Sequence, residues 1–134
     1  MSVEGLNVEA AARDLAGTLF YTALTPYTDP QEGMIERQAW QFGPAHTFNA
    51  LLAMTDMPYE VAERERRRLF REYRDDYMQR YAGGRRLAHV PSEITYRACE
   101  RVFHLAPGSY SELLAEIVDR GVNLTKKMYL QRKN

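Results

Sequence analysis

Residues 58–84, PYEVAERERRRLFREYRDDYMQRYAGG, decide the fold class of this chain. Proline is tolerated in the first turn of a helix, and glycine readily adopts the left-handed conformation in which many helices end. No proline or glycine interrupts the stretch between Pro58 and Gly83. The pattern therefore predicts one helix of about 25 residues over 58–82, which would be about 37 Å long at 1.5 Å per residue.

The charges of this predicted helix nearly cancel. Between Glu60 and Arg80 the sequence places seven arginines and six carboxylates. Pairs that stand four residues apart with the acid first stabilise a helix by about 0.2–0.5 kcal/mol each. Three such pairs occur: Glu60 with Arg64, Glu63 with Arg67, and Asp76 with Arg80. Self-paired charges of this kind are typical of a helix exposed to water.

Aromatic residues mark a narrow second face of the same helix. Tyr73, Tyr77 and Tyr81 recur every four residues and follow Phe70. Tyrosine has an apolar ring and a polar tip, which suits half-buried positions and protein interfaces. We therefore take these four side chains as candidates for a protein interface. The partner is either the protein's own core or another subunit, and stacking on single-stranded bases is a third alternative.

The rest of the chain also has helical spacing. Residues 7–24 repeat apolar side chains at intervals of three and four, and Asn7 suits the N-cap position. Further helices, with breaks at Gly43-Pro44 and Gly121, are predicted over 31–42, 44–54, 92–104 and 109–120. We predict a mainly α protein, a single compact domain over residues 1–134. It would have about five to six helices in an orthogonal or bundle-like arrangement, with one long helix.

Two junctions carry further signals. Trp40 and Phe42 stand just before Gly43-Pro44, where an aromatic pair ordinarily fills a corner of the core and becomes an interface hot spot if it is exposed. Ser109 and Glu112 have the spacing of a capping box at the start of the last predicted helix. The segment 85–91 reads as a connector or a short strand.

Charge is distributed unevenly along the chain. Residues 1–60 hold two basic and eight acidic side chains, whereas residues 61–134 hold sixteen basic and ten acidic ones. Such a chain can fold its halves together, stack head to tail with copies of itself, or offer its basic end to a polyanion. Residues 122–134 carry four positive and no negative charges, and three forms are open for them: a last helical turn, a strand, or a tail that orders only on a partner.

Few residues suggest chemistry. The histidines His46, His89 and His104 fit no metal or catalytic-triad pattern, and Glu100 with His104 supplies only two of the three ligands that a metal needs. Cys99 falls on the apolar face of its helix and reads as a packed core thiol. We expect no metal, no cofactor and no small-molecule ligand. The acidic N-terminal residues and the single cysteine lead us to expect a cytoplasmic protein. We expect no membrane segment, because the longest apolar run, Ala50–Met54, is far shorter than the roughly 20 residues that cross a bilayer.

Three functions follow from these observations. The leading hypothesis is a non-enzymatic protein for protein–protein interaction or assembly: an adaptor, a subunit of a larger complex or virus particle, or an inhibitor that occludes its target, with another protein or a second copy as partner. The alternative is nucleic-acid or polyanion binding, for which the candidates are Arg64, Arg67, Arg71, Arg85, Arg86, Lys126, Lys127, Arg132 and Lys133. A third is a small enzyme or ligand carrier, which would need a concave pocket joining His46 or His104 to acids distant in sequence.

Overall fold

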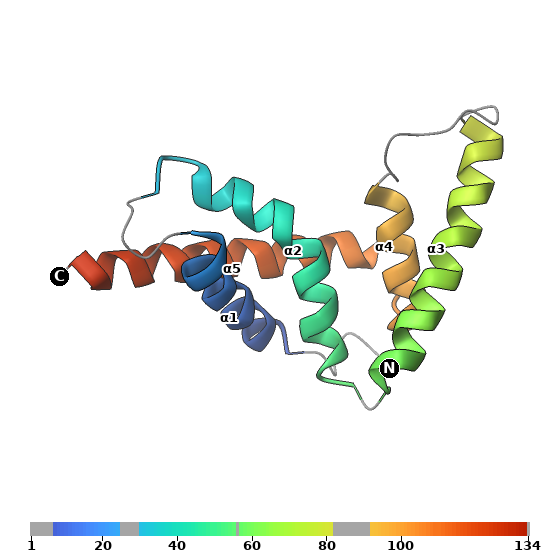
Figure 1. Cartoon of the computed structure of the whole chain (residues 1–134), viewed down its shortest axis with the longest axis horizontal. Coiled ribbons are helices and arrows are strands. Elements are labelled where there is room, and N and C mark those ends of the chain that lie inside the picture. The colour runs from blue at the N-terminus through green and yellow to red at the C-terminus, as the bar shows by residue number, and fades with distance from the viewer. Residues whose placement is uncertain (1–6, 25–29, 56, 82–91, 134) are drawn as a thin grey trace. The chain divides into compact units, whose positions relative to one another are not determined.

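The computed structural model describes residues 7–24, 30–55, 57–81 and 92–133, without the side chains of 73, 76, 77, 80, 81, 92–95 and 133. These ranges are helical and contain no strand, so the prediction of a mainly α protein is confirmed. The elements of the described residues are shown in Figure 1: α1 (Val8–Thr18), η2 (Leu19–Ala23), α2 (Met34–Leu52), α3 (Tyr59–Tyr81), α4 (Ser92–Val102) and α5 (Ser109–Lys133).

The described residues fall into two compact units. Unit 1 takes in residues 57–81 and 92–111, with α3, α4 and the first three residues of α5. Unit 2 takes in residues 7–24, 30–55 and 112–133, with α1, η2, α2 and the rest of α5. The single domain expected from the sequence stays a prediction beside this division.

The first predicted helix changes geometry before it ends. Asn7 caps α1 as expected, because its side-chain oxygen accepts a hydrogen bond of 3.0 Å from the Ala10 amide. After Thr18 the backbone widens into the π-helix η2, in which the Leu24 amide donates to the Leu19 carbonyl. The Thr22 hydroxyl donates to the Thr18 carbonyl at 2.6 Å. A side chain that occupies the carbonyl four residues back competes with the backbone for it, which favours the wider turn.

The predicted break at Gly43-Pro44 is wrong. α2 runs through both residues from Met34 to Leu52 and replaces the two helices expected over 31–42 and 44–54. Proline removes one backbone hydrogen bond and bends a helix without always ending it, and Figure 1 shows α2 changing direction about halfway along. Gly43 faces α5, where a Cβ atom would lie 3.0 Å from Cγ2 of Val118. The glycine therefore allows two helices to approach closely.

The predicted stop at Gly121 is also wrong. α5 continues through it to Lys133, so residues 122–133 take the first of the three forms left open, a helix. A Cβ atom at Gly121 would lie 3.0 Å from Cδ2 of Leu15 and 3.3 Å from the Ala12 carbonyl oxygen. The missing side chain thus lets α5 pack tightly on α1. The long helix expected at 58–82 spans Tyr59–Tyr81, 23 residues, so α5 with 25 residues is the longer of the two.

α5 supplies one side of the core of unit 2. One face of it is buried over four turns, and residues of α1, η2 and α2 complete the core. The fully buried side chains of this core include Leu15, Leu19, Leu51, Leu114 and Ile117. The rings of Phe20 and Tyr129 meet at 4.8 Å between centroids, which joins η2 to the last turns of α5. Lys126 of α5 forms an ion pair of 2.5 Å with Glu36 of α2.

In unit 1, α3 lies beside α4 (Figure 1). Among the side chains of α3 that the structure describes, Ala62 and Leu69 are the buried apolar ones, and α4 contributes Ala98, Cys99 and Val102. These residues form the contact between the two helices.

α4 ends two residues earlier than predicted. His104 has a positive φ of 55°, and the amides of His104 and Leu105 donate to the carbonyls of Arg101 and Glu100. This pair of hydrogen bonds is a Schellman motif, in which one left-handed residue ends the helix. His104 therefore ends the helix through its backbone and is not part of it, in contrast to the predicted helix over 92–104.

The start of α5 is capped from α4. Ser109 is the first helical residue and its hydroxyl donates to the Ala106 carbonyl, so the predicted capping box with Glu112 does not form. Instead the Glu100 carboxylate, 6% exposed, accepts a hydrogen bond of 2.9 Å from the Tyr110 amide. A carboxylate at a helix N-terminus satisfies a free amide and opposes the positive end of the helix dipole. Glu100 thereby ties two helices of unit 1 together.

Candidate interaction surface

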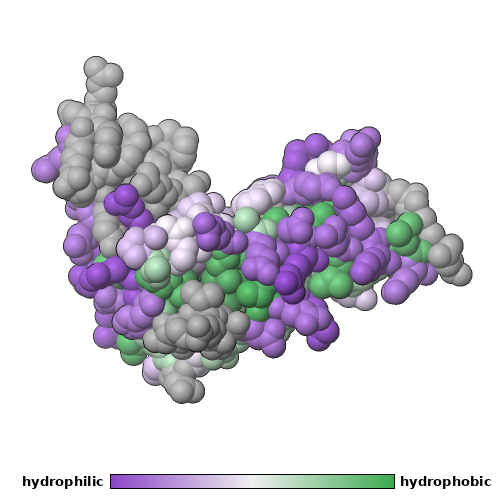
Figure 2. Space-filling model, turned by 180° about the vertical axis from the view of Figure 1, so that it is seen from behind, coloured by the Kyte–Doolittle hydropathy of each residue, from purple (hydrophilic) through white to green (hydrophobic). Residues whose placement is uncertain are grey.

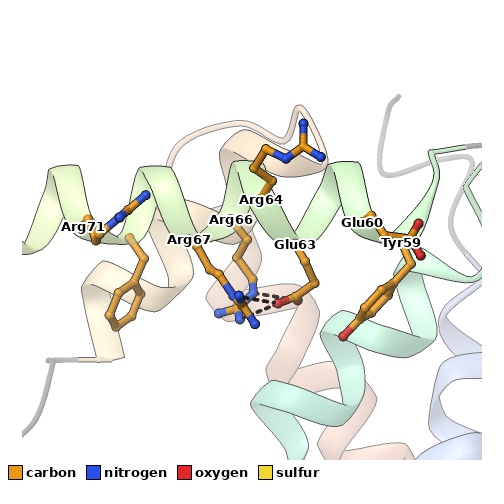
Figure 3. A pocket seen from close by; sticks show the side chains of 8 residues that line it. Tyr59, Glu60, Glu63, Arg64, Arg66, Arg67 and Arg71 are labelled. Atoms are coloured by element: carbon orange, nitrogen blue, oxygen red, sulfur yellow. Dashed lines mark hydrogen bonds and ion pairs between the residues drawn. The ribbon is translucent and has the colours of Figure 1, made fainter.

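An open groove of about 790 Å³ runs along α3 (Figure 3). Its lining includes three of the polyanion candidates from the sequence, Arg64, Arg67 and Arg71, and one interface candidate, Phe70. Its lining residues are Tyr59, Glu60, Glu63, Arg64, Arg66, Arg67, Phe70 and Arg71. Helical spacing explains this grouping, because residues three and four apart share one side of a helix. The groove combines aromatic surface with both signs of charge.

Glu63 neutralises part of the positive charge of the groove. The Arg66 guanidinium donates two hydrogen bonds of 3.0 Å to the Glu63 carboxylate, and Arg67 approaches it at 3.5 Å. Figure 3 shows both arginines turned toward Glu63, whereas Arg64 points away from it. The hydrogen bond from Arg66 lowers the pKa of Glu63 against the opposing effect of burial, and it raises the pKa of Arg66.

Two arginines of the groove have guanidinium groups that are not neutralised by a described acid. The side chains of Arg64 and Arg71 form no ion pair or hydrogen bond within the part of the chain that the structure describes, and both are exposed. They stand seven residues apart and therefore face nearly the same direction, about 10 Å from each other along the axis. Arg68 lies outside the groove and is paired with Glu65 and Glu72. With four arginines and two glutamates, the groove holds a net charge of plus two.

Other candidates from the sequence lie elsewhere or outside the described residues. Trp40 and Phe42 are 49% and 40% exposed on α2, the condition under which the sequence made them interface candidates. The side chains of Tyr73, Tyr77 and Tyr81 lie outside the described residues, as do Arg85 and Arg86 in full.

The basic residues of the C-terminal segment do not gather into one site. Lys126 pairs with Glu36, and its hydrogen bond lowers the pKa of that glutamate. The Arg132 guanidinium lies 5.4 Å from the centre of the Tyr129 ring, a distance suited to a cation–π interaction. Lys127 is exposed, and the side chain of Lys133 lies outside the described residues. Part of this segment is thus used within unit 2, which leaves less of it for a polyanion.

The two units are each close to neutral. Unit 2 joins the acidic residues 6–55, with two basic and five acidic side chains, to residues 112–134, with five basic and three acidic ones. It therefore carries one net negative charge, and unit 1 carries one net positive charge. The uneven charge along the sequence is largely balanced inside unit 2, where the Lys126–Glu36 pair is one direct contact between the two charge types.

Cys99 is a packed core thiol, as the sequence predicted. It is 1% exposed, and burial raises its pKa to about 11. A neutral thiol is a poor nucleophile, because the thiolate is the reactive form.

We expect a thiol reagent to modify Cys99 only after unfolding, and since it is the single cysteine the assay reports one site. The raised pKa also predicts how stability depends on pH. Below pH 9 the thiol is protonated in both states; as pH rises toward 11 only the unfolded chain loses the proton, so the free energy of unfolding falls. Urea denaturation at several pH values in this range measures how steeply the free energy of unfolding falls with pH. In a Cys99→Ala variant this fall should be less steep. Rapid labelling of the folded chain at pH 7 would contradict the burial.

No metal site forms among the described residues, where no group of three or more histidine, cysteine, aspartate or glutamate side chains is placed to hold an ion. His46 contacts the Thr18 hydroxyl at 3.3 Å, an ordinary packing role between α2 and α1.

A second groove of about 530 Å³ in unit 1 is lined by Tyr96, Arg97, Glu100, Arg101, Leu105, Pro107, Gly108 and Ser111. Among the described residues, neither groove is lined by a histidine.

Several exposed residues were missed by the sequence analysis. Figure 2 shows apolar surface on one face in separate areas divided by polar surface. The large apolar side chains exposed in the described residues are Tyr21, Trp40, Phe42, Tyr59, Val61 and Leu130. Tyr21 is 67% exposed and packs edge-on against Phe20. It lies in the π-helix η2, a change of helix geometry for which the sequence carried no signal.

No protein-family model, curated protein or solved structure matches this chain. Within the described ranges, none of the helices combines the length and the apolar character needed to cross a bilayer. The function of the protein must therefore be inferred from its residues and their geometry.

Proposed function

We propose that this is a non-enzymatic protein whose role is contact with other proteins, as an adaptor or as a subunit of an assembly. The observation that carries the proposal is the exposure of four aromatic side chains: Tyr21, Trp40, Phe42 and Tyr59, each at least 40% exposed. Tryptophan, tyrosine and arginine are the residues most enriched at the energetic centres of protein interfaces. The α3 groove adds arginines beside Tyr59 and Phe70.

The mixed charge of the groove also favours a protein partner. A surface that binds phosphates gains affinity from net neutralisation of their charge, and carboxylates on the same surface reduce that gain. Glu60 and Glu63 line the groove together with its arginines. A protein partner tolerates this mixture, because its own side chains can complement both signs.

The expected result is that the purified chain forms species heavier than its 15.5 kDa monomer, or retains a partner from a cell extract. Multi-angle light scattering across a concentration series measures the first, and a pull-down measures the second. Replacing Trp40 and Phe42 together by serine should weaken a contact made through α2 by about tenfold or more. Gln41→Ala, an exposed change between them, is the matched control. A chain that remains monomeric at every concentration and retains nothing would contradict the proposal.

Nucleic-acid binding is the second candidate, supported by the row of Arg64, Arg67 and Arg71 in one groove. It requires an affinity that falls steeply as salt rises, because binding releases condensed counterions. Fluorescence anisotropy with a labelled oligonucleotide measures that slope. Absence of binding at low salt would remove this candidate.

A further inference from the structure

The exposed face of α5 carries a row of acids. Glu112, Glu116 and Asp119 follow one another at intervals of four and three, opposite the buried face that holds Leu114 and Ile117. Glu116 pairs with Arg120 at 2.8 Å. The side chains of Glu112 and Asp119 form no ion pair or hydrogen bond within the described part of the chain.

The arginine row of α3 has the same spacing in the opposite direction. Read from Arg71 backwards, the arginines follow at intervals of four and three, through Arg67 to Arg64. In both rows the first and last residues stand seven positions apart, about 10.5 Å along a helix axis. Two antiparallel helices in this register bring together three pairs of opposite charge: Arg71 with Glu112, Arg67 with Glu116, and Arg64 with Asp119.

The neighbouring positions are complementary in the same register. Glu63 of the groove comes opposite Arg120, and Glu60 comes opposite Asn123, so neither acid of the groove meets an acid. The exposed Ala115 lies on this side of α5 and presents only a methyl group to the groove. The dipoles of two antiparallel helices also point in opposite directions, which is a favourable arrangement.

We propose that α3 of one copy of this chain binds the acidic row of α5 of a second copy, antiparallel and in this register. The inference rests on the proposed function and identifies its partner as the chain itself. Contact between two α3 helices would oppose arginine rows, and contact between two α5 helices would oppose acid rows. The interface is therefore made by two different surfaces. Made reciprocally between two copies, this contact gives a two-fold dimer; made in one direction only, it repeats from copy to copy and gives a ring or an open filament.

The contact is weak and depends on salt. Exposed ion pairs contribute little individually and are screened within about 8 Å at physiological ionic strength. We expect association in the micromolar to millimolar range and a clear loss between about 50 mM and about 500 mM salt. The open groove and its aromatic residues supply the remaining contact area.

Charge reversal with complementation tests the proposal in sedimentation velocity at low salt. The variants R64E/R71E and E112R/D119R should each associate at least about tenfold more weakly than the natural chain, because like charges then face each other. An equimolar mixture of the two should recover association, since every contact between unlike chains again joins opposite charges. R37E/K127E makes the same net charge change as R64E/R71E at exposed positions outside both rows, and should associate like the natural chain.

The outcomes separate this inference from the proposed function. A natural chain that stays monomeric, or a mixture that does not recover association, overturns the contact between α3 and α5. Retention of a different protein in the pull-down would then leave the proposed function standing. If R64E/R71E lowers thermal stability equally at all concentrations without changing mass, the two rows meet inside one chain and the inference is wrong. If R64E/R71E abolishes oligonucleotide binding and leaves self-association unchanged, the arginine row serves nucleic acid and the inference is again wrong.

Discussion

Leu15→Ala is expected to lower the free energy of unfolding by about 2–5 kcal/mol, the range observed for fully buried leucines. Leu15 has no exposed surface, and its Cδ2 atom lies 3.0 Å from the place that a Cβ would take at Gly121. The substitution removes contacts where α1 and α5 approach most closely. The cavity stays open, because Gly121 has no side chain to fill it.

Urea denaturation followed by circular dichroism measures this loss. Leu130→Ala removes the same atoms from a side chain that is 62% exposed, and its effect should stay within about 0.5 kcal/mol. A loss of less than about 1 kcal/mol for Leu15→Ala would show that Leu15 is not in the core of unit 2.

Glu100→Ala is expected to lower the free energy of unfolding by about 2–4 kcal/mol, because the substitution has two effects in unit 1. The variant removes a hydrogen bond to a charged acceptor, which is worth about 1.5–3 kcal/mol, and leaves the Tyr110 amide without its partner. It also removes the buried methylene groups of a side chain that is 6% exposed. Glu100→Gln keeps an acceptor oxygen and the packing, so its loss should be clearly smaller.

The matched control is Glu116→Ala on the exposed side of α5. Its ion pair with Arg120 is half exposed on both sides, and such pairs contribute about 0–1 kcal/mol. Equal losses for Glu100→Ala and Glu116→Ala in urea denaturation would mean that the buried cap does not hold the start of α5.

Part of the candidate surface was predictable from the sequence. The row of Arg64, Arg67 and Arg71 follows from helical spacing alone, since these positions share one side of any α-helix. Glu112, Glu116 and Asp119 lie within the helix predicted over 109–120, so the same spacing rule applies to the acidic row of α5, although the prediction did not include it. The pairing of Glu63 with Arg66 as well as Arg67 depends on side-chain conformation, which sequence spacing does not determine.

Only the tertiary structure shows where the opposite charges of the two halves of the sequence meet. The sequence shows an acidic first half and a basic second half, and leaves open whether they meet within one chain, between chains or with a polyanion. The structure brings residues 112–133 beside α1 and α2 in unit 2, so Lys126 reaches Glu36. This arrangement could not be read from composition, because it depends on which helices share a core.

The sequence by itself determined the helical character of the chain and the Asn7 cap, because these depend on residues within a few turns of each other. Only the tertiary structure decided that Gly43, Pro44 and Gly121 lie inside helices. Glycine costs a helix about 1 kcal/mol and proline about 3 kcal/mol. Close contact of α2 with Val118, and of α5 with Leu15, buries apolar surface that offsets these local costs. Such contacts join residues distant in sequence, so local signals alone could not predict them.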